Sequence, residues 1–243
     1  MRYLITFSYN GSYFSGYQRQ KNLKTVQGEI EKVLTKVNNG KEVVISSSGR
    51  TDKGVHANGQ CAHFDLDVDI TLYGLKDVLN KRLNGEIYIK DVKIVDKDFH
   101  ARYCVKEKTY IYYINIGEYN PIKKDYIYQY CNKLNINLMK KASKYLIGKH
   151  DFRSFCKEEK EKENCIRTIK SINVEKDNNI VKITITGDGF LRKMVRNIVG
   201  VLIEIGTLKK NVMYMKQLVI SNGKIHNMKS SPACGLYLDK VRY

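Results

Sequence analysis

The sequence lacks the features of a membrane or exported protein. No stretch approaches the roughly 18 consecutive apolar residues that a membrane helix needs, and the best run, IVGVLI at 198–203, ends at Glu204. The N-terminal segment MRYLITFSYN alternates and soon becomes polar, which is not the pattern of a signal peptide. We therefore expect a cytoplasmic protein that does not enter a membrane.

The sequence also has no tryptophan, only two prolines and no C-x-x-C pair among its six cysteines, at positions 61, 104, 131, 156, 165 and 234. A zinc ribbon is therefore not expected, and the cysteines are expected to be reduced thiols, several of them in the core. With 42% hydrophobic residues, the 243-residue chain has room for one large domain or two ordinary ones.

Acidic residues are scarce relative to basic ones. The chain has 43 Lys and Arg against 25 Asp and Glu, a formal net charge of +18. Such a field attracts polyanions and raises the rate at which they are encountered. Lysine far outnumbers arginine in a chain also rich in Asn, Ile and Tyr, a bias that codon composition alone can produce. The charge therefore favours nucleic acid binding without establishing it.

The first half of the chain shows a β-α-β-β-α-β order. Residues 1–9 alternate as a strand, and a helix is expected from Val26 to Val37, with Thr25 as its N-cap and Gly40 as its stop. Strands are expected at 42–46, 61–68 and 86–95, with a helix near 71–84. This order is that of a ferredoxin-like unit, in which two helices cover one face of an antiparallel sheet.

The second half repeats the pattern without repeating the sequence. We expect strands at 108–116, 169–175, 180–186 and 235–241, and helices at 138–146 and 190–206. The lysine- and glutamate-rich run at 157–164 is most simply a solvated excursion. The predicted fold is α+β, with domains at 1–104 and 105–243. We expect two ferredoxin-like or RRM-like halves, whose antiparallel sheets flank a central basic cleft suited to RNA.

The passage SSSGRTDKGVHANGQ, at 46–60, is unusually polar for a segment between two strands. Gly49 and Gly54 bracket Arg50 and Asp52, so the backbone can turn sharply and lift both side chains out of the sheet edge. Such an aspartate forms turns more often than it catalyses. A metal site is a further alternative, with His56, Cys61 and His63 as candidate ligands. Their spacing fits no familiar ligand motif, and His63 is expected on the polar face of a strand.

The helix expected at 190–206 has one apolar arc, formed by Leu191, Met194, Val195, Ile198, Leu202 and Ile205. Arg196 lies at the edge of this arc, while Lys193, Asn197 and Glu204 lie opposite. An arginine there either extends its stem to solvent or pairs with a buried carboxylate, whose pKa it would lower. Asp52 is a candidate for that carboxylate.

Three tyrosines lie close together in TYIYYI. Tyr110 and Tyr112 share one face of the expected strand and Tyr113 takes the other. Most strand tyrosines are packing residues. A tyrosine that faces a nucleotide can instead stack on an extruded base, a contact worth about 1–3 kcal/mol.

The segment SGRTDKGVHANGQ resembles the signature of the tRNA pseudouridine synthase A family. YNGSYFSGYQ and TVQGEIE resemble its N-terminal segments, and FHARYCVKEKTYIYYI its central one. GKHDFRSF, RTI, FLRKMVRNIVG and GLYL resemble its later segments, in the expected order. The resemblance spans almost the whole chain. Two departures affect shape more than chemistry: SGYQ has no tryptophan before the glutamine, and LNGEIYI lacks the usual Leu-Pro.

The resemblance implies roles for four residues. Asp52 corresponds to the catalytic aspartate, and Arg50 to the arginine that enters the RNA stem where the target base leaves. Tyr110 corresponds to the tyrosine that stacks on the uracil, and Arg196 to the arginine that pairs with the aspartate. The last assignment agrees with the boundary position of Arg196 on its helix.

The resemblance also implies the reaction. A homodimer without metal or organic cofactor would convert uridine to pseudouridine at positions 38–40 of the tRNA anticodon stem-loop. The base must leave the stack for this chemistry, with Asp52 acting as a nucleophile on C1′ or as a base on the sugar. The alternatives are the same chemistry on ribosomal RNA and a non-catalytic RNA-binding protein. A DNA-binding protein would need a major-groove helix with exposed base readers, which the sequence does not show.

Overall fold

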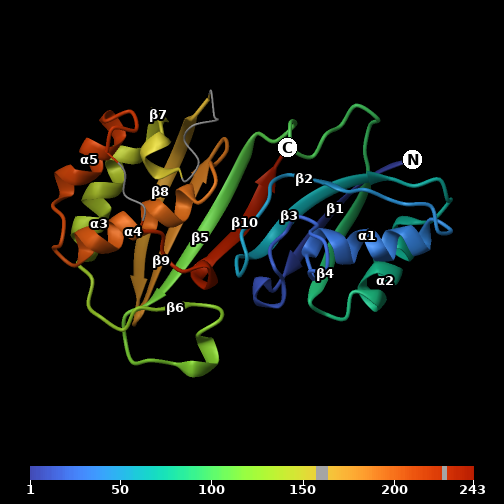
Figure 1. Ribbon diagram of the computed structural model, residues 1–243, viewed down its shortest axis with the longest axis horizontal. Coiled ribbons are helices and arrows are strands. Elements are labelled where there is room, and N and C mark those ends of the chain that lie inside the picture. The colour runs from blue at the N-terminus through green and yellow to red at the C-terminus, as the bar shows by residue number, and fades with distance from the viewer. Residues whose placement is uncertain (157–163, 226–228) are drawn as a thin grey trace. The chain divides into compact units, whose positions relative to one another are not determined.

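The chain forms two compact units of mixed α and β structure, which confirms the predicted fold class. The computed structural model describes residues 1–156, 164–225 and 229–243 (Figure 1). The first unit comprises Met1–Lys106 with Tyr237–Tyr243, and the second comprises Glu107–Leu236. The charged run predicted at 157–164 lies outside the described residues, except for Asn164. Within the described ranges, no helix is long and apolar enough to cross a membrane.

The first unit has the predicted β-α-β-β-α-β order. Its central strand β1 pairs antiparallel with β3 on one side and β4 on the other, and β3 also pairs with the short strand β2 and with β10. The strands are β1 (Arg2–Tyr9), β2 (Ser46–Ser47), β3 (His56–Asp65), β4 (Ile87–Ile94) and β10 (Leu236–Arg242). The helices α1 (Val26–Val37) and α2 (Leu72–Arg82) pack in contact with each other. Alternation places Tyr3, Ile5, Phe7 and Tyr9 in the core.

The first helix begins where the sequence predicts. Thr25 is extended, and its hydroxyl accepts a hydrogen bond from the Gly28 amide at 3.3 Å, which satisfies one amide of the first turn. On the sheet, Tyr3 is opposite Phe64 in the β1–β3 register, and their rings stack 5.9 Å apart. Local capping and strand alternation thus account for this half of the core.

Several features of the first unit differ from the sequence prediction. The strand predicted at 42–46 is reduced to β2, which covers only Ser46–Ser47. β3 begins at His56 and not near residue 61, because its first residues pair in parallel with β10: Tyr237 is opposite His56, and Leu238 opposite Ala57. The approach is close enough that a Cβ on Gly59 would lie 2.5 Å from the Asp239 carbonyl oxygen. We expected the segment that contains β10 to belong to a domain at 105–243, but its residues from Tyr237 onward belong to the first unit.

The second unit contains four antiparallel strands in the order β5–β9–β8–β7, with the short strand β6 parallel to the end of β5. The strands are β5 (Glu107–Asn115), β6 (Tyr128–Gln129), β7 (Gly148–Asp151), β8 (Ile166–Asp177) and β9 (Ile180–Gly187), and the helices are α3 (Ile136–Ser143), α4 (Met194–Gly206) and α5 (Val212–Ile220). Short 3₁₀ turns in the two units cover Gly11–Tyr13, Pro121–Lys123, Lys144–Leu146, Arg153–Phe155 and Ala233–Gly235. The predicted hairpin over KDNN is confirmed. The sheets are not purely antiparallel as predicted, because β6 and β10 each pair in parallel.

Helix α4 is shorter and more deeply buried than predicted. It begins at Met194 and not at residue 190, because Lys193 takes a left-handed conformation, with φ of 62°. Asn197, expected on the polar side, is buried; its side-chain nitrogen donates to the Phe155 carbonyl oxygen at 2.8 Å and its oxygen accepts from the Ser230 hydroxyl. A Cβ on Gly200 would lie 2.1 Å from the Lys229 carbonyl oxygen, so backbone packs directly against this side of the helix.

His63 is buried, although the sequence places it on a polar strand face. Its Nδ1 accepts a hydrogen bond from the Ala101 amide at 3.1 Å, and its ring lies 4.7 Å from the ring of His100. Burial, with His100 and Arg2 nearby, lowers the pKa of His63. The folded state therefore favours neutral His63, whereas an unfolded histidine protonates near pH 6.5.

The first unit should consequently become less stable as the pH falls. A lowered folded-state pKa contributes stability above the unfolded value, and this is lost as pH falls through the folded value, with a slope of at most about 1.4 kcal/mol per pH unit for one group. His63→Asn keeps an acceptor for the Ala101 amide and should flatten the decline between pH 7.5 and 5, measured by urea unfolding. His150→Asn serves as the control. Equal slopes in wild type and His63→Asn would contradict the assignment.

Candidate active site

Arg50 and Asp52 lie together on the loop between β2 and β3. Gly54 takes a left-handed conformation, with φ of 79°, and the Val55 amide donates to the Asp52 carbonyl oxygen at 3.1 Å, which closes a turn. Of the two glycines that bracket the motif, only Gly54 needs this conformation. Arg50 is exposed and Asp52 is half-buried. The turn thus presents both charged side chains at the surface of the first unit.

The loop at 10–20 holds this turn from one side. The Tyr17 amide donates to the Thr51 carbonyl oxygen at 3.1 Å, and the Tyr9 hydroxyl bonds the Thr51 hydroxyl at 2.8 Å. A Cβ on Gly11 would lie 2.1 Å from the Val55 carbonyl oxygen, so only glycine permits this backbone approach. Burial raises the pKa of Tyr9 to about 12, and its hydroxyl stays neutral at physiological pH.

Gln60 anchors the start of the same turn from β3. Its side-chain oxygen accepts from the Ser48 hydroxyl at 2.6 Å and from the Cys61 amide at 3.1 Å. Its side-chain nitrogen donates to the Gly49 carbonyl oxygen at 2.9 Å. Gln60 is fully buried, so water cannot replace these partners. The residues before and after Asp52 are therefore both fixed.

The histidines and cysteine near the loop have structural roles. His56 is buried; its Nδ1 accepts from the Gly11 amide at 3.0 Å, and its ring stacks on Tyr237 at 4.6 Å. His63 is committed to the Ala101 amide, and Cys61 lies 3.5 Å from the Thr6 hydroxyl. Among the residues that the structure describes, no group of three His, Cys, Asp or Glu could hold a metal ion. The alternative of a metal site in this loop therefore has no ligand set to support it.

In the second unit, Tyr110 lies on β5 opposite Ile185 and is half-buried. The ring of Phe190 meets it edge to face, with centroids 5.1 Å apart at 84°. Phe190 in turn needs Gly187, because a Cβ there would approach the Phe190 ring to 3.2 Å and the Thr168 carbonyl oxygen to 2.7 Å. Phe190 therefore fixes one side of the Tyr110 ring.

Tyr112 is a packing residue, as most strand tyrosines are. It is fully buried, and its hydroxyl donates to the Pro232 carbonyl oxygen at 2.7 Å. Burial raises its pKa, an effect that the nearby Arg196 partly opposes. Of the two tyrosines that share this face, only Tyr110 has surface for a ligand.

Arg196 is half-buried in the first turn of α4 and is held by Ser231. Its Nε donates to the Ser231 carbonyl oxygen at 2.7 Å, and its own carbonyl oxygen accepts from the Ser231 amide at 3.1 Å. The Ser231 hydroxyl also donates to that oxygen, at 3.0 Å. The Arg196 side chain is thus oriented by a hydrogen bond to the backbone and does not simply extend into solvent. Its proposed anion partner stays a prediction.

The structure places two of the four predicted residues in each unit. Arg50 and Asp52 share one turn of the first unit, while Tyr110 and Arg196 belong to β5 and α4 of the second. Sequence reasoning did not identify Gln60 or Phe190. A polar residue within the buried run of β3 was an available signal for Gln60; Phe190 carried no signal, because its contact depends on the path of residues 187–190.

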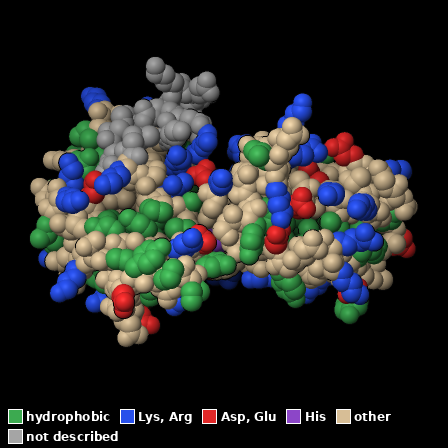
Figure 2. All heavy atoms as spheres, turned by 60° about the horizontal axis from the view of Figure 1, so that its bottom comes forward, with side chains coloured by type: hydrophobic (Ala, Val, Ile, Leu, Met, Phe, Trp, Pro, Cys, Tyr) green, Lys and Arg blue, Asp and Glu red, His purple; other side chains and the backbone are tan. Residues whose placement is uncertain are grey.

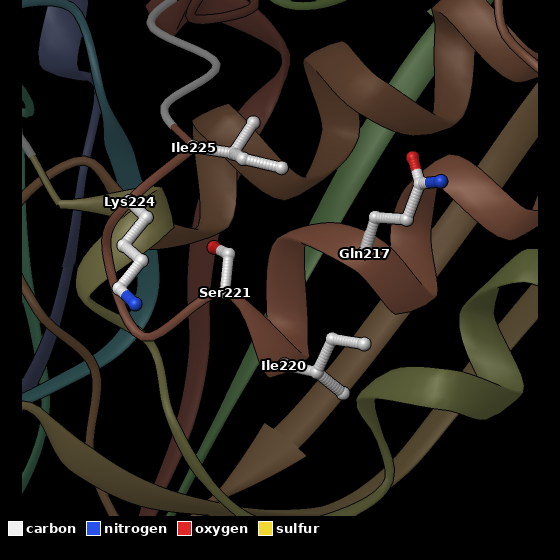
Figure 3. Close-up of a pocket in the computed structure, with 5 residues that line it drawn as sticks. All are labelled: Gln217, Ile220, Ser221, Lys224 and Ile225. Atoms are coloured by element: carbon white, nitrogen blue, oxygen red, sulfur yellow. The ribbon is translucent and has the colours of Figure 1, made fainter.

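Basic side chains are scattered over both units on the face that Figure 2 shows, in keeping with the net charge of +18. A separate open pocket lies at the end of α5 and is lined by Gln217, Ile220, Ser221, Lys224 and Ile225 (Figure 3). Among the described residues that line it, this pocket has no carboxylate and none of the predicted site residues. It therefore gives no support to a catalytic role.

Comparison with known proteins gives a consistent result. The family model described as tRNA pseudouridine synthase matches residues 5–104 and 142–243, ranges that include Arg50, Asp52 and Arg196 but not Tyr110. Among relatives called tRNA pseudouridine synthase A, that of Thermosipho melanesiensis is 39% identical, covering 100% of this chain and 99% of its own. That of Streptococcus uberis is 41% identical (100% and 98%), and that of Mycoplasmoides gallisepticum 42% (99% and 90%).

Gln60→Met should destabilise the first unit. The substitution keeps the volume but removes the hydrogen bonds that Gln60 makes to the Ser48 hydroxyl, the Cys61 amide and the Gly49 carbonyl, at a cost of about 2–3 kcal/mol in the free energy of unfolding. Gln20→Met is the matched control, because Gln20 is exposed and only donates to the Ser15 carbonyl oxygen at 3.0 Å. Urea unfolding measures both variants, and equal midpoints would show that Gln60 does not anchor the turn.

Proposed function

This chain belongs to the tRNA pseudouridine synthase family and is an RNA pseudouridine synthase, and we propose that it converts uridine to pseudouridine in tRNA with Asp52 as the catalytic carboxylate. The observation that carries the assignment is the turn that presents Asp52. The carbonyl oxygen of Thr51, the residue before Asp52, accepts from the Tyr17 amide at 3.1 Å. The Asp52 carbonyl oxygen accepts from the Val55 amide at 3.1 Å. A carboxylate on so constrained a turn meets the geometric demand of catalysis.

The reaction rearranges bonds within one nucleotide. The N1–C1′ bond breaks, the uracil rotates, C5 bonds to C1′, and the proton on C5 is replaced by one on N1. Asp52 acts at the ribose, as nucleophile on C1′ or as base on the sugar, and in either role it must be ionised. Because the rearrangement is an isomerisation, it consumes no oxidant, reductant or group donor.

Arg50 and Tyr110 handle the displaced base. The target uridine must leave the RNA stack before its sugar face is accessible. Arg50, exposed beside Asp52, enters the space that the base vacates and supplies a cation to the surrounding phosphates. Tyr110, fixed on one side by Phe190, stacks on the uracil and holds it while it is detached.

Arg196 is proposed to supply the counter-charge for Asp52. A guanidinium beside a carboxylate makes charge-assisted hydrogen bonds that stabilise the ionised form. Arg196 has the required charge, and its bond to Ser231 fixes the guanidinium stem. We propose that Arg196 and Asp52 form an ion pair.

The substrate is proposed to be the anticodon stem-loop of tRNA, at positions 38–40, bound by a homodimer in the cytoplasm. The net charge of +18 supplies the attraction for a polyanion. Lysines on the walls of a basic cleft would hold phosphates without reading sequence.

Asp52→Asn should abolish pseudouridine formation, with a loss of at least about 10³-fold in kcat and little change in RNA affinity, because the shape of the turn is kept while the charge is lost. Asp67→Asn is the control, since that exposed carboxylate only pairs with Lys41. Pseudouridine is mapped in total RNA from cells that carry each variant in place of the wild type. Retained activity in Asp52→Asn would overturn the catalytic assignment, and losses only outside tRNA would overturn the substrate.

Arg196→Met should lower kcat by about 10²-fold at neutral pH. The substitution removes the counter-charge and the charge-assisted hydrogen bonds that the guanidinium offers to the Asp52 carboxylate. Arg196→Lys restores the charge and should recover part of the rate. Arg82→Met on α2 is the surface control. Normal turnover in a folded Arg196→Met protein would refute the ion pair.

A further inference from the structure

We infer that Gln18 is a positioning residue that sets the orientation of Arg50 before RNA arrives, an inference that rests on the proposed role of Arg50. The Arg50 Nη1 lies 2.5 Å from the Gln18 side-chain oxygen, although the two residues are far apart in sequence. Both side chains are exposed. A long surface side chain normally samples many rotamers, so a bond of this kind is informative only if its partner is itself fixed.

The backbone on both sides of Gln18 is fixed. Tyr17 is buried, its amide donates to the Thr51 carbonyl oxygen at 3.1 Å, and its carbonyl oxygen accepts from the Gln27 amide at 2.9 Å. On the other side, the Arg19 amide donates to the Gln27 side-chain oxygen at 3.1 Å. Gln18 therefore projects from a backbone tied both to the catalytic turn and to the first turn of α1.

A buried carboxylate on α1 helps to hold the backbone around Gln18. Glu31 lies on α1 and is only 4% exposed. One of its oxygens accepts from the Gln27 side chain at 2.8 Å and from the Ile45 amide at 3.1 Å, and the other lies 3.3 Å from the Arg19 guanidinium. The proposed chemistry does not use this charge. Its contacts instead connect α1 to Arg19, directly and through the Gln27 side chain, which accepts from the Arg19 amide.

The chemical nature of Gln18 suits a partner of an RNA-binding arginine. Its amide oxygen occupies one guanidinium donor and leaves the others for phosphate or base. A glutamate would also accept this bond, but it would place a negative charge next to the RNA and neutralise the cation that binds it. A neutral acceptor orients Arg50 without either effect.

The test is a double-mutant cycle on the full-length protein. Gln18→Ala should lower kcat/KM for tRNA by about 3- to 10-fold, the range for one net hydrogen bond. In an Arg50→Met background the same change should have no further effect, because the group that Gln18 orients is absent. Gln18→Glu should keep kcat but raise KM, and the rise should diminish with added salt. Gln20→Ala, two residues away, is the control.

The outcomes separate this inference from the proposed function. If Gln18→Ala behaves as Gln20→Ala does while Asp52→Asn is inactive, the positioning role is wrong and the catalytic assignment stands. If Gln18→Ala lowers kcat/KM equally with and without Arg50, Gln18 acts independently of Arg50 and the inference is overturned. If Arg50→Met is fully active, the proposed role of Arg50 fails together with the inference, again without affecting Asp52.

Discussion

The candidate active site depends on one backbone contact, between the loop at 10–20 and the turn that carries Asp52. The Tyr17 amide donates to the Thr51 carbonyl oxygen, and Gly11 lets the same loop lie directly against Val55. Neither contact involves a charged group. The turn that carries the proposed catalytic residues is therefore positioned by neutral, largely buried atoms.

The other proposed site residues are likewise held in place by uncharged groups. Tyr110 is placed by the ring of Phe190, and Arg196 by the main chain and hydroxyl of Ser231. In each case an uncharged partner fixes the stem of the functional side chain. Gln18 extends the pattern to Arg50. The exception is Glu31, whose buried charge is matched by Arg19 away from the catalytic turn.

The parts of the fold that depend on local sequence were predictable. The alternation of β1 and the Thr25 cap are both as predicted, because neighbouring residues determine them. The start of β3 at His56 and the burial of Asn197 were not, since each depends on a segment distant in sequence. In the candidate site, the resemblance identified the charged and aromatic residues. Gln60 and Phe190 went unrecognised because their role comes from contacts and not from their own chemistry.

The parallel pairing of β10 with β3 has a consequence for synthesis. Tyr237 covers His56, and the Asn58 side chain donates to the Asp239 carboxylate at 2.9 Å, so the strand after the catalytic turn is bordered by residues from the far end of the chain. The ribosome must make the whole second unit before this border exists. A nascent chain with its first helices already formed would have β1 and β2 beside β3 but would lack β10, so the first unit is complete only after the second unit has been synthesised.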